Sequence, residues 1–429
     1  MKIIIKNGRI IDPLSGTDEH ADVLIVDDRI EKIKAGIPDK DAHEILDATD
    51  CLVLPGLIDM HVHFREPGRE DIETIIGGSI VAAKSGFTSV CTMPNTTPVI
   101  DNQALVRFIK LEAEKGPINV FPIATITKGS RGEEISEMGE LVQGGAVGFS
   151  DDGRPIMRSI LMRRALEYVR MFDLPIITHS EDLDLSDNGV MNEGATSTFL
   201  GLKGIPREAE EVMIARDVIL TRLTRAKLHV AHVSSGGSLD IIRRAKDEGI
   251  NVSCETAPHY FSLTDESIAE QLSLAKMYPP LRTEHDRRAI IEGLRNGIID
   301  VIATDHAPHL ENEKKQEIEY SPFGIIGLET AVPLVITILV KENNFSFREA
   351  FAKLTCNPSR ILNLERGELK TGSVADITVI NPDKTVTIDD TFLISKCKNT
   401  PFIGRKLYGS VEFTICNGKV VYRSEQGQH

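Results

Sequence analysis

Two histidines separated by a single residue, His61 and His63, follow the apolar run 52–58. On a β-strand, residues two apart point to the same side, so both imidazoles can face one point in space. Imidazole is the commonest metal ligand in proteins, and it suits zinc and its neighbours. The pair therefore predicts a metal site, although two histidines in a surface loop would have the same spacing.

Further polar residues follow later apolar runs along the chain. They are Asp151 and Asp152, His179, His232, Glu255 with His259, and Asp305. A catalytic zinc takes about three protein ligands and leaves one position open for water, so this set exceeds the needs of one ion. Four histidines with two or more carboxylates instead predict two metals that share a bridging carboxylate.

A repeating pattern of elements would bring these residues together. From about Leu54, a short apolar run followed by a helical pattern recurs eight times. The predicted strands are 57–63, 88–93, 119–125, 146–150, 175–179, 227–232, 251–255 and 300–304, and the predicted helices include 71–85, 103–114, 159–171, 208–224, 238–248 and 284–296. Eight such units predict an α/β fold of the (β/α)₈ TIM-barrel type, whose strand ends meet at one mouth. A doubly wound open sheet is the alternative, but its phosphate-binding glycine fingerprint is missing.

Both ends of the chain have a different texture of short strands and turns. Strand-like runs occupy 2–6, 21–26, 30–33, 372–380 and 411–421, and Asn417-Gly418 has the composition of a hairpin turn. We expect residues 1–52 and 367–429 to pair into one small composite β-sandwich beside a barrel formed by residues 53–366. The segment 424–429 is expected to fray.

Composition narrows the class of protein. The formal net charge is −15, which argues against a nucleic-acid-binding face or an anionic-membrane anchor. The six cysteines are scattered without a C-x-x-C pair, as is usual in a reducing compartment. The N-terminal apolar run is too short for a signal peptide, and the apolar stretch 331–340 is too short to span a bilayer. We therefore expect a cytoplasmic protein.

Several longer motifs resemble those of the amidohydrolase superfamily and, within it, of the bacterial-type (class I) dihydroorotases. The first is His61-Val62-His63-Phe64-Arg65-Glu66-Pro67-Gly68, and the others lie at 92–96, 149–153, 190–194, 210–217, 279–282, 303–309, 327–330 and 399–402. The resemblance therefore runs almost from end to end of the chain.

The resemblance implies a ligand set for two zinc ions. The first zinc would be held by His61, His63 and Asp305, the second by His179 and His232, and both by Asp152 as a bridge. Many relatives bridge their metals with a carbamylated lysine, but the fourth predicted strand ends in two aspartates and offers no lysine. Residue chemistry alone does not separate Asp151 from Asp152; the second aspartate matches the position in the family motif.

The resemblance also implies an activity, the reversible hydrolysis of (S)-dihydroorotate to N-carbamoyl-L-aspartate in de novo pyrimidine synthesis. A zinc-activated hydroxide would attack the ring amide, and Asp305 would carry the proton to the leaving nitrogen. Arg65 lies on the same side of an extended segment as His63, and its planar fork suits the carboxylate of this small-molecule substrate. Asn95 and His309 are the family's other carboxylate contacts. A homodimer and a complex with aspartate transcarbamoylase are the implied assemblies.

One residue departs from the family pattern. Tyr278 precedes Pro279-Pro280-Leu281-Arg282 where the family usually has an asparagine that contacts the pyrimidine ring. Another cyclic-amide hydrolase, such as a hydantoinase or allantoinase, is therefore one alternative, and a catalytically inactive partner of aspartate transcarbamoylase is another. The charged segment 310–323 follows the eighth predicted strand, and it is interpreted as a lid over the site rather than a solvated loop.

Overall fold

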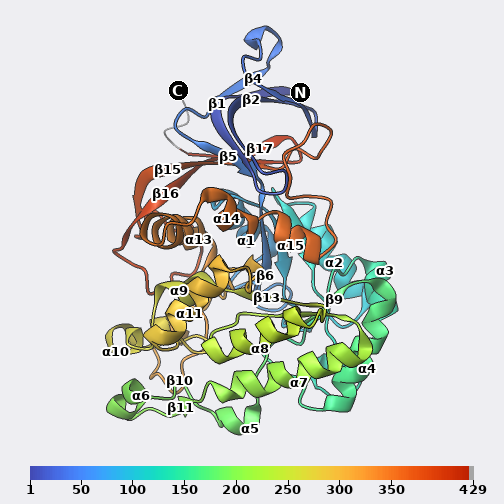
Figure 1. Ribbon diagram of the computed structural model, residues 1–429, viewed down its shortest axis with the longest axis vertical. Coiled ribbons are helices and arrows are strands. Elements are labelled where there is room, and N and C mark those ends of the chain that lie inside the picture. The colour runs from blue at the N-terminus through green and yellow to red at the C-terminus, as the bar shows by residue number, and fades with distance from the viewer. Residues whose placement is uncertain (425–429) are drawn as a thin grey trace.

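A closed barrel of parallel strands forms the body of the molecule, as the computed structural model of residues 1–424 shows (Figure 1). Its regular strands are β6 (Leu57–Val62), β7 (Phe87–Thr92), β8 (Asn119–Pro122), β9 (Pro175–Thr178), β12 (Lys227–Val230), β13 (Val252–Thr256) and β14 (Val301–Ile302). Their residues are almost all buried, because helices cover the outside and side chains fill the inside. Of the segment expected to fray, residues 425–429 lie outside the described part of the chain.

Two short contacts complete the ring of strands. The predicted fourth strand, 146–150, narrows to a parallel bridge in which Phe149 pairs with Ala124 on one side and Ile176 on the other. The first and eighth strands meet through a parallel bridge between Val62 and His306. The predicted (β/α)₈ barrel is thereby confirmed.

Side chains cap four of the helices that follow the barrel strands, namely α1 (Ile75–Lys84), α2 (Gln103–Ala113), α8 (Gly236–Asp247) and α11 (Glu284–Arg295). The others are α3 (Met138–Gly144), α4 (Ser159–Val169), α7 (Glu208–Thr224) and α13 (Leu328–Leu334), whose N-cap residues make no side-chain cap hydrogen bond. Helix α1 starts four residues later than the predicted 71–85, because the Thr74 side chain accepts the Gly77 N–H and caps the helix there. Ser235 caps α8 in the same way by accepting the Ser238 N–H, directly after the sixth barrel strand.

Short helices insert between these units. They are α5 (Leu183–Ser186), α6 (Ala195–Leu200), α9 (Pro258–Ser262), α10 (Ser267–Gln271), α12 (Glu311–Lys314), α14 (Phe347–Ala352) and α15 (Cys356–Ile361), with a two-residue pair β10 (Met191–Asn192) and β11 (Gly204–Ile205). The apolar stretch 331–340 lies in α13 and the π-helix Val335–Glu342, and its side chains are buried almost throughout. Within the described residues, no helix combines the length and apolar character needed to cross a membrane.

The two chain ends form one β unit, as predicted, and this unit is a single continuous sheet. Its strand order is β17-β16-β15-β5-β1-β2-β3, and β4 also pairs with β1. The bounds are β1 (Lys2–Asp12), β2 (Thr17–Val26), β3 (Arg29–Lys34), β4 (Glu44–Asp47), β5 (Leu52–Pro55), β15 (Ile377–Thr387), β16 (Lys406–Cys416) and β17 (Lys419–Arg423). The sheet encloses its own apolar core and lies at the top of Figure 1, where β1 and β17 are labelled.

The chain passes from this sheet to the barrel at Gly56. The run 52–58 divides there, so that β5 pairs with β1 and β15 while β6 begins the barrel. A Cβ atom at residue 56 would lie 2.1 Å from the Thr88 hydroxyl oxygen, so only glycine fits between the two. The domain boundaries at residues 52 and 366 stay predictions.

Candidate active site

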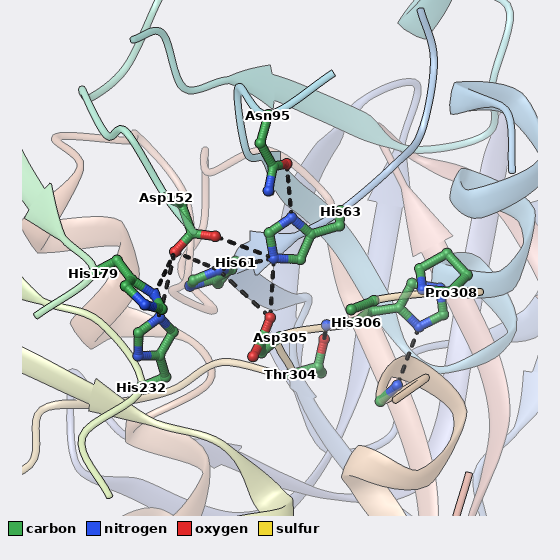
Figure 2. A network of polar contacts seen from close by, with 12 residues as sticks. His61, His63, Asn95, Asp152, His179, His232, Thr304, Asp305, His306 and Pro308 are labelled. Carbon is green, nitrogen blue, oxygen red and sulfur yellow. Dashed lines mark hydrogen bonds and ion pairs between the residues drawn. The ribbon is translucent and has the colours of Figure 1, made fainter. Parts of the chain in front are cut away.

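The end of β6 places two imidazoles side by side. The Nε2 atoms of His61 and His63 are 3.2 Å apart, and both side chains are almost completely buried. His61 Nδ1 lies 2.7 Å from Glu255 Oε1, and His63 Nδ1 lies 2.9 Å from Asn95 Oδ1 (Figure 2 draws the second contact). Since the carboxylate and amide oxygens accept hydrogen bonds, each imidazole carries its proton on Nδ1 and presents an Nε2 lone pair to its neighbour.

The ends of β9 and β12 place a second pair of imidazoles against the first. His179 Nδ1 lies 3.0 Å from His232 Nε2, and His179 Nε2 lies 3.3 Å from Glu181 Oε2. The proton of His179 is therefore on Nε2, and Nδ1 faces the site. His61 and His179 thus use opposite ring nitrogens toward the same centre, because each has its carboxylate partner on the opposite nitrogen.

The carboxylate of Asp152 lies between the two pairs, as Figure 2 shows. Its Oδ1 is 3.3 Å from His232 Nε2 and 3.7 Å from His179 Nδ1, while its Oδ2 is 3.5 Å from His63 Nε2. Asp151 points elsewhere, because its carboxylate accepts the backbone N–H groups of Ile126 and Thr127. The two neighbouring aspartates are therefore clearly distinguished by position, with only Asp152 among the imidazoles.

The carboxylate of Asp305 closes the set on the side of His63. Its Oδ1 lies 3.0 Å from His63 Nε2 and 3.6 Å from His61 Nε2. Asp305 adopts a backbone φ of 49°, and His232 adopts 36°, in the left-handed region that side chains other than glycine disfavour. Such strain is typical of functional sites, where the surrounding structure holds a residue in an unfavourable conformation.

The cluster contains acceptors in excess of donors. Ring nitrogens and carboxylate oxygens of His61, His63 and Asp152 come within 4.8 Å of one another, as do those of Asp152, His179 and His232. With the outer nitrogens of His61, His63 and His179 protonated, lone pairs converge on one point. Converging lone pairs and carboxylates repel unless cations lie between them, and borderline-soft divalent metals prefer this mixture of imidazole and carboxylate. The donor set therefore fits a metal centre.

The electrostatics of the cluster favour positive charge. Burial lowers the pKa of His61, but the Asp152 and Asp305 carboxylates outweigh it and raise that pKa well above its ordinary value. Burial raises the pKa of Asp152, but the neighbouring histidines outweigh it and hold that pKa well below its ordinary value. The same opposition lowers the pKa of Glu255, which hydrogen bonds to His229 and His61. A cation would therefore be strongly stabilised here.

A cavity of about 160 Å³ opens above the cluster. Its lining includes all the predicted site residues except His61, which lies beneath: His63, Arg65, Asn95, Asp152, His179, His232, Tyr278, Asp305 and His309, with Gly153, Met277, Ala307, Phe323 and Gly324. The sequence prediction thus named residues that the fold gathers into one place.

One wall of the cavity carries a cation and a neutral imidazole. Arg65 Nε donates to the Pro308 carbonyl over 3.2 Å, and its Nη2 lies 3.4 Å from His309 Nε2. Burial, reinforced by the Arg65 charge, lowers the pKa of His309 to about 3. His309 is therefore neutral at physiological pH, and Arg65 is the fixed positive charge at this wall.

Another part of the cavity lining is aromatic. The Tyr278 ring lies 5.0 Å from the His179 ring and 4.6 Å from the Phe323 ring, measured between centroids. Burial and the nearby Glu181 carboxylate raise the pKa of Tyr278 above its ordinary value. Tyr278 thus contacts both a site histidine and the segment that ends at Phe323.

The segment 310–323, which was predicted to be a lid, borders the cavity through Phe323. Two buried lysines, of which Lys314 belongs to the segment itself, bind its backbone carbonyls. Lys276 Nζ donates to the carbonyls of Ile318 and Ser321, and Lys314 Nζ donates to those of Pro322 and Gly324. Burial lowers the pKa of Lys314 to about 7. Lys314 is buried although it stands in a run of charged residues, because the carbonyls of Pro322 and Gly324 accept hydrogen bonds from its ammonium group.

Several residues with contacts to the site were not predicted from the sequence, or were predicted for another role. Glu181 and Glu255 each bond an imidazole of the cluster, although neither was assigned a role. Asn95 was expected to contact substrate, and here its side-chain oxygen also orients His63. Glu181 stands two residues after His179, so the same alternation that predicted the histidine pair could have found it.

Comparisons with known proteins agree with this geometry. A family model described as "Dihydro-orotase-like" matches residues 50–238, and one described as "Amidohydrolase family" matches residues 321–422. The chain is 52% identical over 421 residues to the dihydroorotase of Pelotomaculum thermopropionicum, covering 98% of each chain. It is 51% identical to the dihydroorotase of Geobacter metallireducens, covering 99% of this chain and all of that one.

Solved structures agree on the fold. The L-hydantoinase of Arthrobacter aurescens superposes with a TM-score of 0.88 at 23% identity, covering 98% of this chain and 96% of that one. The dihydropyrimidinase of Brevibacillus agri superposes with a TM-score of 0.86 at 22% identity, covering 99% and 95%. At these identities the likeness concerns architecture alone. The full-length identity above 50% is the stronger relation, and by it the chain belongs to the dihydroorotase family.

Proposed function

We propose that the protein is a dihydroorotase, a metal-dependent hydrolase that interconverts (S)-dihydroorotate and N-carbamoyl-L-aspartate. One observation carries the proposal: a cluster of converging metal-ligand atoms and a fixed guanidinium line the same small cavity. A cyclic amide that bears a carboxylate needs both, because the amide must be activated while the carboxylate is held.

In this proposal the cavity binds two zinc ions. His61, His63 and Asp305 would hold one, His179 and His232 the other, and Asp152 both. When bound, the pair of ions would lower the pKa of a water molecule and polarise the amide carbonyl of the substrate.

The substrate would be oriented by three polar side chains that line the cavity, Arg65, His309 and Asn95. Arg65 directs its guanidinium into the cavity, where a planar fork matches a carboxylate. The neutral His309 would contact the same carboxylate, for which its Nε2, now an acceptor 3.4 Å from Arg65 Nη2, would have to carry the ring proton, and the Asn95 amide lines the same cavity. With its carboxylate held by these three side chains, the substrate would present its ring amide to the metal ligands.

Asp305 would move the proton. During hydrolysis a water oxygen bonds to the ring carbonyl carbon, the ring C–N bond breaks, and the former ring nitrogen must gain a proton. The carboxylate of Asp305 can take that proton from water and return it to the leaving nitrogen, because it is buried in the cavity wall beside His63. The reverse sequence closes the ring.

Steady-state assays of the zinc-loaded protein on dihydroorotate, hydantoin and allantoin test the proposal. We expect turnover of dihydroorotate alone. Turnover of hydantoin or allantoin only would instead assign a different cyclic amide. Absence of turnover on all three, with zinc bound, would favour an inactive partner, an alternative that the complete set of metal-ligand side chains argues against.

Three features of the cellular setting stay predictions, namely a homodimer, a complex with aspartate transcarbamoylase and a cytoplasmic location. Sedimentation velocity of the purified chain, alone and mixed with the transcarbamoylase of the same organism, tests the two assemblies. A monomer at micromolar concentration would contradict the first of them.

A further inference from the structure

We infer that Glu255 is a positioning residue that fixes which nitrogen of His61 faces the metal, and that His229 holds Glu255 in place. The inference rests on the proposed metal centre and does not depend on which cyclic amide is the substrate. It concerns three side chains on three barrel strands, beneath the cavity and out of reach of the substrate.

The contacts form one chain through the barrel interior. Glu255 Oε1 lies 2.7 Å from His61 Nδ1, and Glu255 Oε2 lies 3.1 Å from His229 Nε2. His229 Nδ1 lies 2.8 Å from the Ser253 hydroxyl. His61 and His229 have no exposed surface, and Glu255 is 1% exposed.

The chemistry of these groups allows one consistent arrangement of protons. An ionised carboxylate only accepts hydrogen bonds, so both imidazoles donate to Glu255. His229 then carries its proton on Nε2 and accepts from the Ser253 hydroxyl through Nδ1. His61 carries its proton on Nδ1, which leaves the Nε2 lone pair facing His63 and Asp152 as a metal ligand must.

Glu255 has no other task among the described residues. Within residues 1–424 its two carboxylate oxygens bond only these two imidazoles, and no lysine or arginine of that range pairs with it. His229 stands three residues before His232 on the same segment, and it lies below the site rather than at its edge. A buried charge with no cation beside it is costly, unless a metal on the far side of His61 supplies the compensating charge.

The test measures zinc affinity rather than turnover. Purified wild type, Glu255→Gln, His229→Leu and His229→Gln are equilibrated with zinc buffered by a competing chelator, and bound zinc is counted by mass spectrometry. Asp286→Asn is the control, because Asp286 is equally buried but bonds Arg207, a backbone N–H and Thr283 instead of a histidine. Nitrogen-15 NMR of histidine-labelled protein reads the tautomer of His61 directly.

We expect Glu255→Gln to lower the affinity for one of the two zinc ions by about 10–100-fold and to leave the affinity for the other near the wild-type value. His229→Leu should weaken the same ion, whereas His229→Gln should retain it, because the glutamine amide can donate from near the position of Nε2. Asp286→Asn should bind both ions like the wild type. The His61 tautomer signal should become mixed in Glu255→Gln.

Wild-type zinc affinity with an unchanged His61 signal in Glu255→Gln would overturn this inference and leave the proposed metal centre standing. A wild type that binds no zinc would overturn both. If Glu255→Gln fails to fold by circular dichroism, the two His229 variants decide, and equal zinc affinity in His229→Leu and His229→Gln overturns the inference.

Discussion

In each half of the candidate metal centre, a glutamate hydrogen bonds to a histidine, but the two glutamates are held by different kinds of structure. His61 is backed by Glu255 and, behind it, by His229, and all three stand on barrel strands. His179 is backed by Glu181, which lies on the loop after β9, and is flanked by Tyr278, which lies on the loop before α11. Strand residues are held by the hydrogen-bond ladder on both sides, whereas loop residues depend on their own side-chain contacts.

The difference separates what the barrel fixes from what its loops can adjust. The orientation of His61 follows from strands that the fold requires, so that half of the centre should vary little with substrate or conditions. The orientation of His179 depends on Glu181, Tyr278 and, through Phe323, on the segment 310–323. Ligand binding in the cavity should therefore change the orientation of His179 more readily than that of His61.

Removing the carboxylate that both halves share should have the largest effect. In Asp152→Ala we expect both zinc ions and all turnover to be lost, because Asp152 faces imidazoles of each pair. Zinc analysis and an assay on dihydroorotate check this. The neighbouring Asp151→Asn is the matched control: it should keep its zinc but lose about 1–3 kcal/mol of unfolding free energy, since Asp151 bonds backbone N–H groups.

The half of the centre that contains His61 and His63 can also be tested at Asp305. Asp305→Asn should lower kcat by about 10²–10⁴-fold, the usual contribution of a positioned acid–base group, while most of the zinc remains. Activity and metal content measured on the same preparation check this. Unchanged turnover would remove Asp305 from the proton path.

The carboxylate that supports His179 from a loop can be tested in the same way. Glu181→Gln should lower the affinity for the zinc held by His179 by about tenfold, which is the lower end of the range for residues that hydrogen bond to a metal ligand. The effect should be small because one carboxylate oxygen of Glu181 has no hydrogen-bond partner among the described residues. The chelator titration used for Glu255→Gln measures it. A larger loss from Glu181→Gln than from Glu255→Gln would reverse the assignment of rigid and adjustable halves.

A smaller effect is expected from the aromatic wall. Tyr278→Asn removes ring contacts with His179 and Phe323, each worth about 0.5–1.5 kcal/mol, so kcat/KM should fall by about 2–10-fold, mainly through KM. Tyr278→Phe keeps the ring and should behave almost like the wild type. A large loss in Tyr278→Phe would mean that the hydroxyl, rather than the ring, is what the site uses.

The smallest effect concerns pH. The pKa of Lys314 is lowered by burial to about 7 in the folded protein, whereas an unfolded lysine titrates near 10.5. Between these values the unfolded chain binds more protons, so the unfolding free energy should rise with pH. In Lys314→Met that rise should shrink by about 1–2 kcal/mol between pH 7 and pH 9, as urea denaturation measures. Parallel curves for the two proteins would contradict it.

Many residues of this centre can be predicted from the alternation of side-chain directions along strands. The spacing of His61 and His63 and the polar ends of later strands predicted residues that the fold does bring together, because parallel strands in a barrel all end at one mouth. Contacts between loops do not follow from such periods. Asp151 and Asp152 have the same side chain, and only the backbone of the segment between α3 and α4 decides which one faces the imidazoles.

The charged segment 310–323 illustrates the same limit. A lysine in a run of charges is normally solvated, and nothing in the local pattern distinguishes Lys314 from Lys315. Lys314 is buried because carbonyls at 322 and 324 turn back over it, which is a property of the folded loop. The fourth barrel strand was located correctly but its length was not, since pairing at Phe149 depends on both neighbours.

The left-handed backbone at His232 and Asp305 has a consequence for how this protein can change. Each residue costs about 1–3 kcal/mol of conformational strain, which glycine would relieve without loss of the barrel. A laboratory selection for heat resistance alone would therefore favour glycine at both positions and would discard two of the predicted ligands. At these two positions the residue that is best for stability differs from the residue that is needed for catalysis. A thermostable variant that remains active must therefore gain its stability elsewhere, for instance in the β-sheet formed by the two chain ends.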